Sequence, residues 1–266
     1  PGRSGSALSF DGSNDYVRCN SCSSPVPDEL TIEAWIKLDG DVSSYATVYE
    51  KRYGVANLRI NSDEKLYFST YCSSSCGGSN NQYLTGSTAL VPGVWYHVAA
   101  VFSESGDFLK VYLNGTLDGN ATLPSSYNLL AYASYDYIGR GSYFGSYYFD
   151  GLIDEVRVST IARTEFVINE TFNPQNWSHP AIVWVRVNAL PIISSINSVT
   201  DTFQHYGEVI NDDVDEDLTL VYWRFDEGTG TKTYDEVKGI EGTMPNTPQP
   251  SWVAGVSGKA LDIEYD

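Results

Sequence analysis

Short stretches in which apolar and polar residues alternate follow one another along the first 160 or so residues, and they constrain the fold more than any other feature. The clearest is 30–38, LTIEAWIKL, whose alternation is typical of a half-buried strand. The stretch 94–102 is almost continuously apolar, which predicts a central strand. Asn114 and Gly115 follow the predicted strand 109–113 and form a strong hairpin signal.

The other predicted strands of this region are equally short. They cover 58–60 and 65–71, on either side of a turn-like segment, then 137–140 and 149–158. Long amphipathic helical patterns are absent, and Val, Thr, Tyr and Gly are frequent. The sequence therefore predicts an all-β fold, a sandwich or jelly roll built from short strands and Gly-rich turns.

The charge balance excludes some partners. Thirty-four acidic residues against 16 basic ones give a formal net charge of −18, so the chain repels phosphate backbones and anionic membrane surfaces. We therefore expect no nucleic-acid partner. No apolar run approaches the roughly 20 residues of a membrane-spanning helix, so we expect no membrane span. The sequence shows no initiator Met and no signal peptide, and it is interpreted as a mature or excised chain.

The four cysteines form two close pairs in the sequence, Cys19 with Cys22 and Cys72 with Cys76. Ser-, Gly- and Asn-rich segments surround both pairs, and 49 residues separate the inner cysteines. Two disulfides in an exported protein are the favoured interpretation, and a zinc site is the alternative. Four cysteines allow three pairings, among which the sequence does not choose. We expect a secreted, extracellular protein associated with the cell surface.

The two ends of the chain repeat one pattern. Ser4–Leu8 reads SGSAL and Ser257–Leu261 reads SGKAL, and each enters a predicted strand. Between them the composition changes: 181–187 alternates like a strand, and 208–217 holds six carboxylates in ten residues. This pattern predicts three parts, which are 1–175, an acidic connector with one strand at 176–219, and a C-terminal part at 220–266.

Six motifs give the chain a resemblance to a known family. They are YWRFDEG (222–228), SALSFDG (6–12), TIEAW (31–35), WYHVA (95–99), VYLNG (111–115) and GLIDEVRV (151–158). Together they resemble the laminin-G-like, concanavalin A-like lectin/glucanase jelly-roll modules, over about 220 of the 266 residues. The resemblance implies a concanavalin A-like jelly-roll β-sandwich of two antiparallel sheets, with a C-terminal strand extension.

The motif order departs from the family, because the 222–228 motif would be expected before the 6–12 motif. Residues 220–266 then supply the opening strands that residues 1–175 lack. They close either within the chain, as in a circularly permuted module, or in a neighbouring copy by donor-strand exchange. The residues expected to carry this pairing are Leu218, Leu220, Tyr222, Trp223, Phe225, Ala260, Leu261 and Ile263.

Two functional hypotheses follow. The first is a non-enzymatic extracellular structural or adhesive protein that assembles head-to-tail with copies of itself into a filament or surface array. The second is a monomeric carbohydrate-binding, lectin-like module of an adhesin or a polysaccharide-degrading enzyme, with cell-surface or environmental glycans as partners. Aromatic-rich segments supply candidates for glycan or subunit contact: Tyr132, Tyr135, Tyr143, Phe144 and Tyr147.

Catalysis is not expected. Glycoside hydrolysis needs two carboxylates about 5–9 Å apart across a cleft, whereas the neighbouring Asp154 and Glu155 would point to opposite faces of a strand. No histidine is paired with a Ser or Cys nucleophile in the sequence pattern. The family resemblance implies one calcium site, which would fall on Asp154 and Asp235, although Lys238 in the same loop would oppose a cation. No other cofactor is expected.

Overall fold

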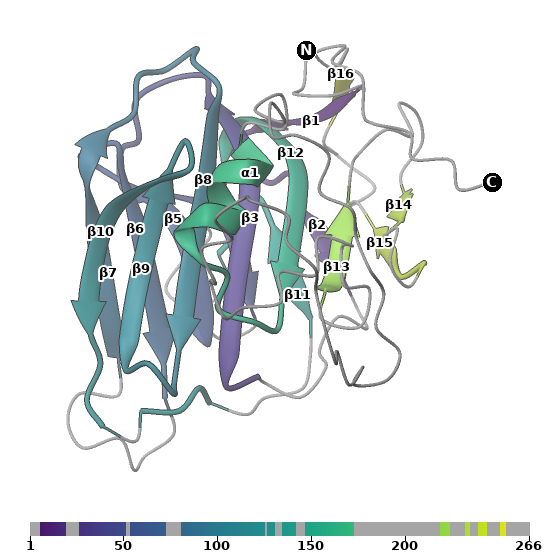
Figure 1. The fold of residues 1–266 in the computed structure, drawn as a ribbon. Helices are drawn as coiled ribbons and strands as arrows, with labels where there is room; N and C mark the ends of the chain where they lie inside the picture. The colour runs from purple at the N-terminus through teal and green to yellow at the C-terminus, as the bar shows by residue number, and fades with distance from the viewer. Residues whose placement is uncertain are drawn as a thin grey trace, which may run out of the picture.

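The computed structural model describes residues 6–19, 27–51, 54–72, 81–125, 127–130, 135–141, 147–172, 219–223, 232–234, 239–243 and 251–253. Two antiparallel sheets pack face to face (Figure 1), which confirms the predicted β-sandwich. Sheet A has the order β10 (Thr116–Thr122), β9 (Phe108–Leu113), β8 (Tyr96–Ser103), β3 (Glu29–Leu38), β12 (Asp150–Ser159), β1 (Ala7–Asp11) and β16 (Ser251–Val253). A further strand, β13 (Thr219–Trp223), pairs with β12 outside this row.

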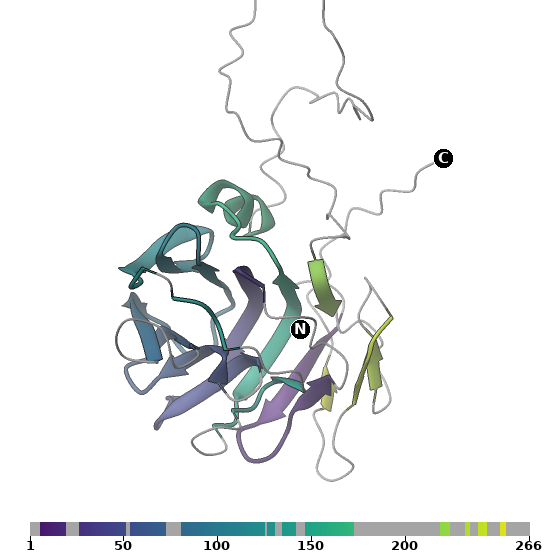
Figure 2. The ribbon, with the colours of Figure 1, turned by 90° about the horizontal axis from the view of Figure 1, so that it is seen from below.

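Sheet B also runs across eight strands. Its order is β14 (Lys232–Tyr234), β15 (Glu241–Thr243), β2 (Val17–Cys19), β11 (Asp136–Ile138), β4 (Tyr45–Lys51), β5 (Ala56–Asn61), β6 (Lys65–Tyr71) and β7 (Asn81–Ala89). The helix α1 (Glu165–Phe172) lies outside the layer formed by sheet A, whereas β13, β14 and β15 lie on the side of the sandwich away from β7 and β10 (Figure 2).

Strand alternation decides which side chains enter the core. On β3, Leu30, Ile32 and Ile36 are fully buried between the sheets, as their spacing of two predicts. The alternate side chains face outward, where Ile168 of α1 packs in a small second cluster with Val101 and neighbouring residues. The predicted central strand is β8, which lies between β9 and β3.

The predicted hairpin joins β9 and β10. Asn114 and Gly115 both have positive φ angles, 49° and 77°, and Leu113 pairs with Thr116. Two consecutive residues with positive φ form the mirror-image turn whose twist matches that of the flanking strands. Asn tolerates this conformation better than most residues, and Gly adopts it freely, which explains why this dipeptide occupies the turn.

Two strands share one edge of β12. Its other edge pairs with β3 along most of its length, from Gly151 to Ser159. On the shared edge, β1 pairs with Asp150–Ile153, and β13 pairs with Val156–Ser159. A register shift between Asp154 and Arg157 separates the two halves, and Glu155 there has a φ of 50°. The irregularity is a β-bulge, which bends the strand where its neighbour changes.

The described C-terminal strands pair within this chain. Leu220, Tyr222 and Trp223 of the predicted pairing set lie in β13, whereas Leu218, Phe225, Ala260, Leu261 and Ile263 lie outside the described residues. Further along, β15 pairs with β2, and β16 pairs with β1. Exchange of these strands between copies stays a prediction. The pairing seen here is complete without a second copy of the chain. The boundaries at 175 and 219 also stay predictions, because the described part of the chain breaks off between 172 and 219.

Candidate functional site

The outer face of sheet B carries a row of polar and aromatic side chains that pair across six strands. Along β5 and β6, apolar residues such as Leu58 and Phe68 point into the core, so the residues that alternate with them point outward. Successive backbone pairings align one outward residue from each strand. The row consists of Arg18 on β2, Tyr137 on β11, Glu50 on β4, Asn57 on β5, Ser69 on β6 and Tyr83 on β7.

Four tyrosine rings gather on this outer face, and we call them the tyrosine face: Tyr45, Tyr67, Tyr83 and Tyr147. The ring centroids of Tyr45 and Tyr67 are 5.1 Å apart, those of Tyr45 and Tyr147 5.2 Å, and those of Tyr67 and Tyr83 5.7 Å. The last pair is stacked, with 23° between the ring planes. Tyr83 is 61% exposed, and the other three are half-buried. The face therefore offers aromatic surface and phenol groups to solvent.

A buried ion pair supports these rings. Arg59 Nη2 donates a 2.8 Å hydrogen bond to Glu50 Oε2, and both side chains are almost fully buried. The guanidinium carbon of Arg59 lies 5.8 Å from the ring centroid of Tyr45 and 5.3 Å from that of Tyr147. Cation–π contacts of this length fix the rings relative to the strand beneath. The tyrosine face is therefore preorganised.

The phenol of Tyr67 stays neutral at physiological pH. Burial, together with the neighbouring Tyr45, raises the pKa of Tyr67 to about 12. A protonated phenol both donates and accepts a hydrogen bond. The arrangement suits a ligand that has one apolar face and many hydroxyls.

Two of the predicted contact residues lie on this side of the sandwich. Tyr147 belongs to the tyrosine face, and Tyr135 packs against Arg18 of the same row, with the guanidinium carbon 5.0 Å from its ring centroid. Tyr132, Tyr143 and Phe144 lie outside the described residues. Sequence reasoning missed Tyr45, Tyr67 and Tyr83.

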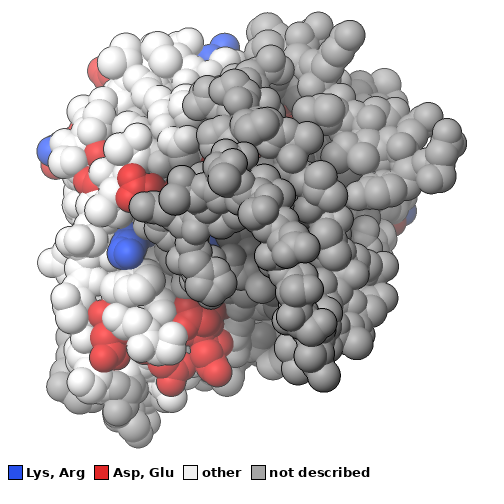
Figure 3. All heavy atoms as spheres, viewed as in Figure 1, with Lys and Arg blue, Asp and Glu red and all other residues white. Residues whose placement is uncertain are grey.

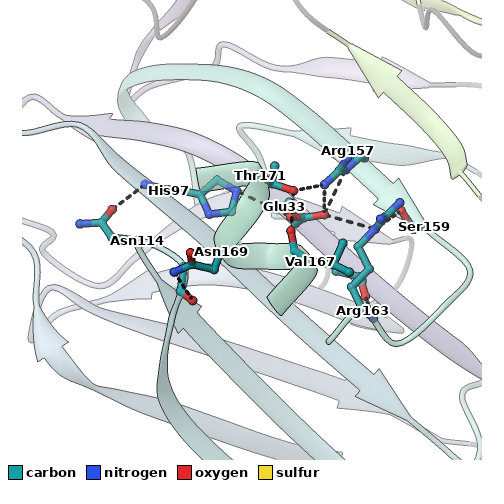
Figure 4. A network of polar contacts seen from close by, with 11 residues as sticks. Glu33, His97, Asn114, Arg157, Ser159, Arg163, Val167, Asn169 and Thr171 are labelled. Carbon is teal, nitrogen blue, oxygen red and sulfur yellow. Dashed lines mark hydrogen bonds and ion pairs between the residues drawn. The ribbon is translucent and has the colours of Figure 1, made fainter. Parts of the chain in front are cut away.

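A separate polar network is buried between sheet A and α1 (Figure 4). Its centre is Glu33 of β3, which is 1% exposed. Arg157 Nη2 and Nε donate hydrogen bonds of 2.7 and 3.0 Å to Glu33 Oε2. Arg163 Nε lies 3.5 Å from the same oxygen, and His97 Nε2 lies 3.7 Å from Oε1. Arg157 also donates to Thr171 Oγ1 of the helix at 2.7 Å.

The network ties the helix to the sheet. Burial alone would raise the pKa of Glu33, but Arg157, His97 and Arg163 outweigh it, so the pKa is lowered and the carboxylate stays charged. Because Glu33 is sealed from solvent and its Oε2 is held by arginine donors, it is placed to hold α1 and not to meet a substrate. We assign it a structural role.

Acidic side chains also gather toward the lower end of the face shown in Figure 3. Burial, followed by repulsion from Asp28, Glu29 and Asp107, raises the pKa of Glu104 in the turn between β8 and β9.

Of the predicted calcium ligands, Asp154 is fully buried on β12, and Asp235 lies outside the described residues. Within the described ranges, no three His, Cys, Asp or Glu side chains are grouped to hold a metal ion.

Cys19 and Cys72 are both disulfide-bonded. Both lie in the core, Cys19 at the end of β2 and Cys72 directly after β6. Which of the three possible pairings they form stays open, because Cys22 and Cys76 lie outside the described residues. In the part of the chain that the structure describes, no helix is long and apolar enough to cross a membrane.

Comparison with known families supplies the identification. Residues 11–169 match the family described as the concanavalin A-like lectin/glucanases superfamily, which is more than half of the chain. The chain belongs to this family. The match covers the strands from β2 to β12 and most of α1, and it confirms the resemblance seen in the sequence motifs. A search of the curated proteins gave no match.

Solved structures that resemble this chain include a protein described as putatively carbohydrate-binding. A putative carbohydrate-binding protein from Bacteroides ovatus aligns with a TM-score of 0.61 and 20% identity over 98% of this chain, and the chain spans 63% of that protein's length. A heptameric SAP-like pentraxin from Limulus polyphemus aligns with a TM-score of 0.48 and 19% identity, covering 63% of this chain and 82% of its own. At these identities the likeness shows the fold alone.

Proposed function

We propose that this chain is a non-enzymatic carbohydrate-binding module that binds glycans on the outer face of sheet B. The observation that carries the proposal is the tyrosine face, a set of neighbouring rings held in place by the Arg59–Glu50 pair. The spacing between the ring centroids, 5.1 to 5.7 Å, is of the order of one sugar unit. Of the two functional hypotheses from the sequence, the lectin-like module is the one supported.

Stacking on aromatic rings suits sugars because the C–H groups on one side of a sugar ring form an apolar face. The hydroxyls at the rim of the sugar can exchange hydrogen bonds with the phenols, among them that of Tyr67, whose pKa burial raises to about 12. Membership of a lectin and glucanase family supports this choice, and so does the likeness to a protein described as putatively carbohydrate-binding.

We further propose that the module acts outside the cell, because disulfide-bonded Cys19 and Cys72 need an oxidising compartment. Calcium binding through Asp154 and Asp235 stays a proposal. The extracellular location and the calcium site are separate from the glycan contacts proposed for the tyrosine face, which need no ion.

The test is a screen of the native chain on a glycan array, followed by calorimetry with the glycans that bind. Tyr83→Ala and Tyr67→Ala each remove one ring of the stacked pair. We expect affinity to fall about two- to tenfold per ring, since an aromatic contact contributes about 0.5–1.5 kcal/mol beyond its buried area. Tyr83→Ala should leave the thermal unfolding temperature almost unchanged, because the side chain is largely exposed.

Phe166→Ala is the matched control. Phe166 is an aromatic residue of α1, 53% exposed, on the opposite side of the sandwich. Its removal should not change glycan binding. Absence of any glycan ligand would overturn the proposal, as would affinity that is unchanged in both tyrosine variants.

A further inference from the structure

Arg140 is surrounded by aromatic rings next to the tyrosine face. Its guanidinium carbon lies 4.9 Å from the ring centroid of Tyr16, 5.3 Å from that of Tyr137 and 5.8 Å from that of Tyr148. All four side chains are half-buried, so they form part of the molecular surface. Rings on several sides hold a guanidinium in one place while leaving its N–H donors free for a partner.

Arg18 flanks the same rings from the neighbouring strand. It pairs across β2 and β11 with Tyr137, on which Arg140 packs, and its own guanidinium lies over Tyr135. Through Tyr137 this group is continuous with the tyrosine face, because Tyr137 pairs on its other side with Glu50. Two arginines and their rings thus extend the proposed binding surface toward β2.

These two arginines lack the acidic partners that the buried cations have. Elsewhere in the described residues, Arg59 pairs with Glu50 at 2.8 Å, Lys51 with Asp136 at 3.3 Å, and Arg157 with Glu33 at 2.7 Å. No ion pair or side-chain hydrogen bond among the described residues involves Arg18 or Arg140, and the Nε atom of each is buried without a hydrogen-bond partner. Of the five described arginines, Arg59, Arg157 and Arg163 each pair with a glutamate, whereas Arg18 and Arg140 do not.

We propose that Arg18 and Arg140 bind the carboxylate of an acidic sugar. The inference rests on the proposed function and names the class of glycan that the same face takes. A planar carboxylate matches the fork of N–H donors that a guanidinium presents, and the two groups form paired hydrogen bonds. The rings of Tyr135 and Tyr137 place the sugar that bears the carboxylate beside the guanidinium groups.

The net charge of −18 specifies the ligand further. The field of the whole chain repels a densely charged polyanion, whereas a single carboxylate at short range meets mainly the two nearby arginines. The ligand is therefore a neutral glycan that carries isolated acidic sugars, either as terminal residues or as branches. A uniformly charged polymer such as polygalacturonate binds more weakly than such a glycan.

The experiment uses matched glycan sets on one array. Lactose is printed with sialyllactose and sulfolactose, and xylo-oligosaccharides are printed with and without one glucuronic acid branch. We expect the carboxylated member of at least one set to bind ten times more tightly than its neutral counterpart. Arg18→Gln and Arg140→Gln should each lower that affinity roughly ten- to a hundredfold, the range for a charge-assisted hydrogen bond. Binding of the neutral member should change little.

Two further variants separate the ligand contact from folding. Lys110→Gln is the matched control, because Lys110 Nζ lies 4.2 Å from the ring centroid of Phe108 on sheet A, away from this face. It removes one ring-stacked cation and should leave binding unchanged. Arg140→Lys keeps the charge and removes the fork, so it should recover only part of the affinity lost in Arg140→Gln. Thermal unfolding of each variant checks that the fold is intact.

The outcomes distinguish this inference from the proposed function. Equal binding of neutral and carboxylated members, with Tyr83→Ala still weakening both, would overturn the acidic sugar and leave the tyrosine face as a neutral-glycan site. Preference for the sulfated member would overturn the carboxylate assignment in favour of a sulfate ester. Binding of no glycan at all would overturn the proposed function itself and this inference with it.

Discussion

Replacing Glu33 by Gln tests whether the buried network holds α1 on sheet A. Two guanidinium groups, those of Arg157 and Arg163, share this one carboxylate, and Glu33 is sealed from solvent. Glutamine keeps the shape and removes the charge, so both cations lose their counter-ion. Removing one partner of a buried ion pair destabilises a protein by about 3–5 kcal/mol. The side chains of Arg157 and Arg163 keep 12% and 9% of their surface exposed, so water solvates the unpaired guanidinium groups in part. We therefore expect the free energy of unfolding to fall by about 3 kcal/mol, the lower end of this range.

Calorimetric or circular-dichroism unfolding measures the effect. A loss of about 3 kcal/mol corresponds to a decrease in the unfolding temperature of roughly 6–12 °C for a domain of this size. Glu29→Gln is the control, since Glu29 begins the same strand, is less buried, and accepts only hydroxyl hydrogen bonds from Ser103 and Ser105 among its described contacts. A decrease below about 2 °C for Glu33→Gln, or one equal to that of the control, would refute the reasoning.

The pH dependence of the same variant gives an independent check. The pKa of Glu33 is lowered from its ordinary value of 4.5, so its contribution to stability is present above pH 4.5 and is lost as the pH falls toward the pKa in the folded state. The difference between the native chain and Glu33→Gln should therefore be constant at neutral pH and should shrink below about pH 4.5. A difference that grows on acidification would contradict the assigned sign.

Two other substitutions test the packing of the sandwich. Gly151 has a φ of 134°, and a Cβ there would collide with the carbonyl oxygen of Lys37; Gly151→Ala should cost roughly 2–4 kcal/mol in denaturant unfolding. Gly40→Ala, where a Cβ would meet nothing within 4 Å, should change stability little. Tyr49→Phe removes the 2.6 Å hydrogen bond that the phenol donates to buried Asp136 and should cost about 1–3 kcal/mol. For Gly151→Ala or Tyr49→Phe, an unfolding free energy within about 0.5 kcal/mol of that of the native chain would contradict the expectation.

Local patterns predicted much of the sandwich, because alternation and turn residues act over a few positions. The segment 30–38 became β3 (Glu29–Leu38), and the Asn114–Gly115 dipeptide became the hairpin turn. β7 was missed, since Asn81–Ala89 is mostly polar and exposed, and only Leu84 in it belongs to the hydrophobic core. Helix α1 was missed because eight residues with one buried apolar side chain give a weak helical pattern.

The candidate site was only partly predictable, for a different reason. Tyr135 and Tyr147 stood out because their segments are rich in aromatic residues. Tyr45, Tyr67 and Tyr83 come from three separate strands, and what brings them together is the register between β4, β5, β6 and β7. The sequence of a single strand does not specify which residue lies opposite on its neighbour. Tyr67, at an outward position of the predicted strand 65–71, was the signal available.

The shared edge of β12 has a consequence for how the chain reaches its native state. The segment that pairs with Val156–Ser159 lies some 60 residues further along, at Thr219–Trp223. During synthesis, the ribosome therefore exposes this half of the strand, with its backbone donors and acceptors open, well before the segment that pairs with it emerges. Closure then depends on a contact of long sequence separation, which slows folding. The nascent protein is consequently open to strand addition by other molecules for the time needed to translate the intervening residues.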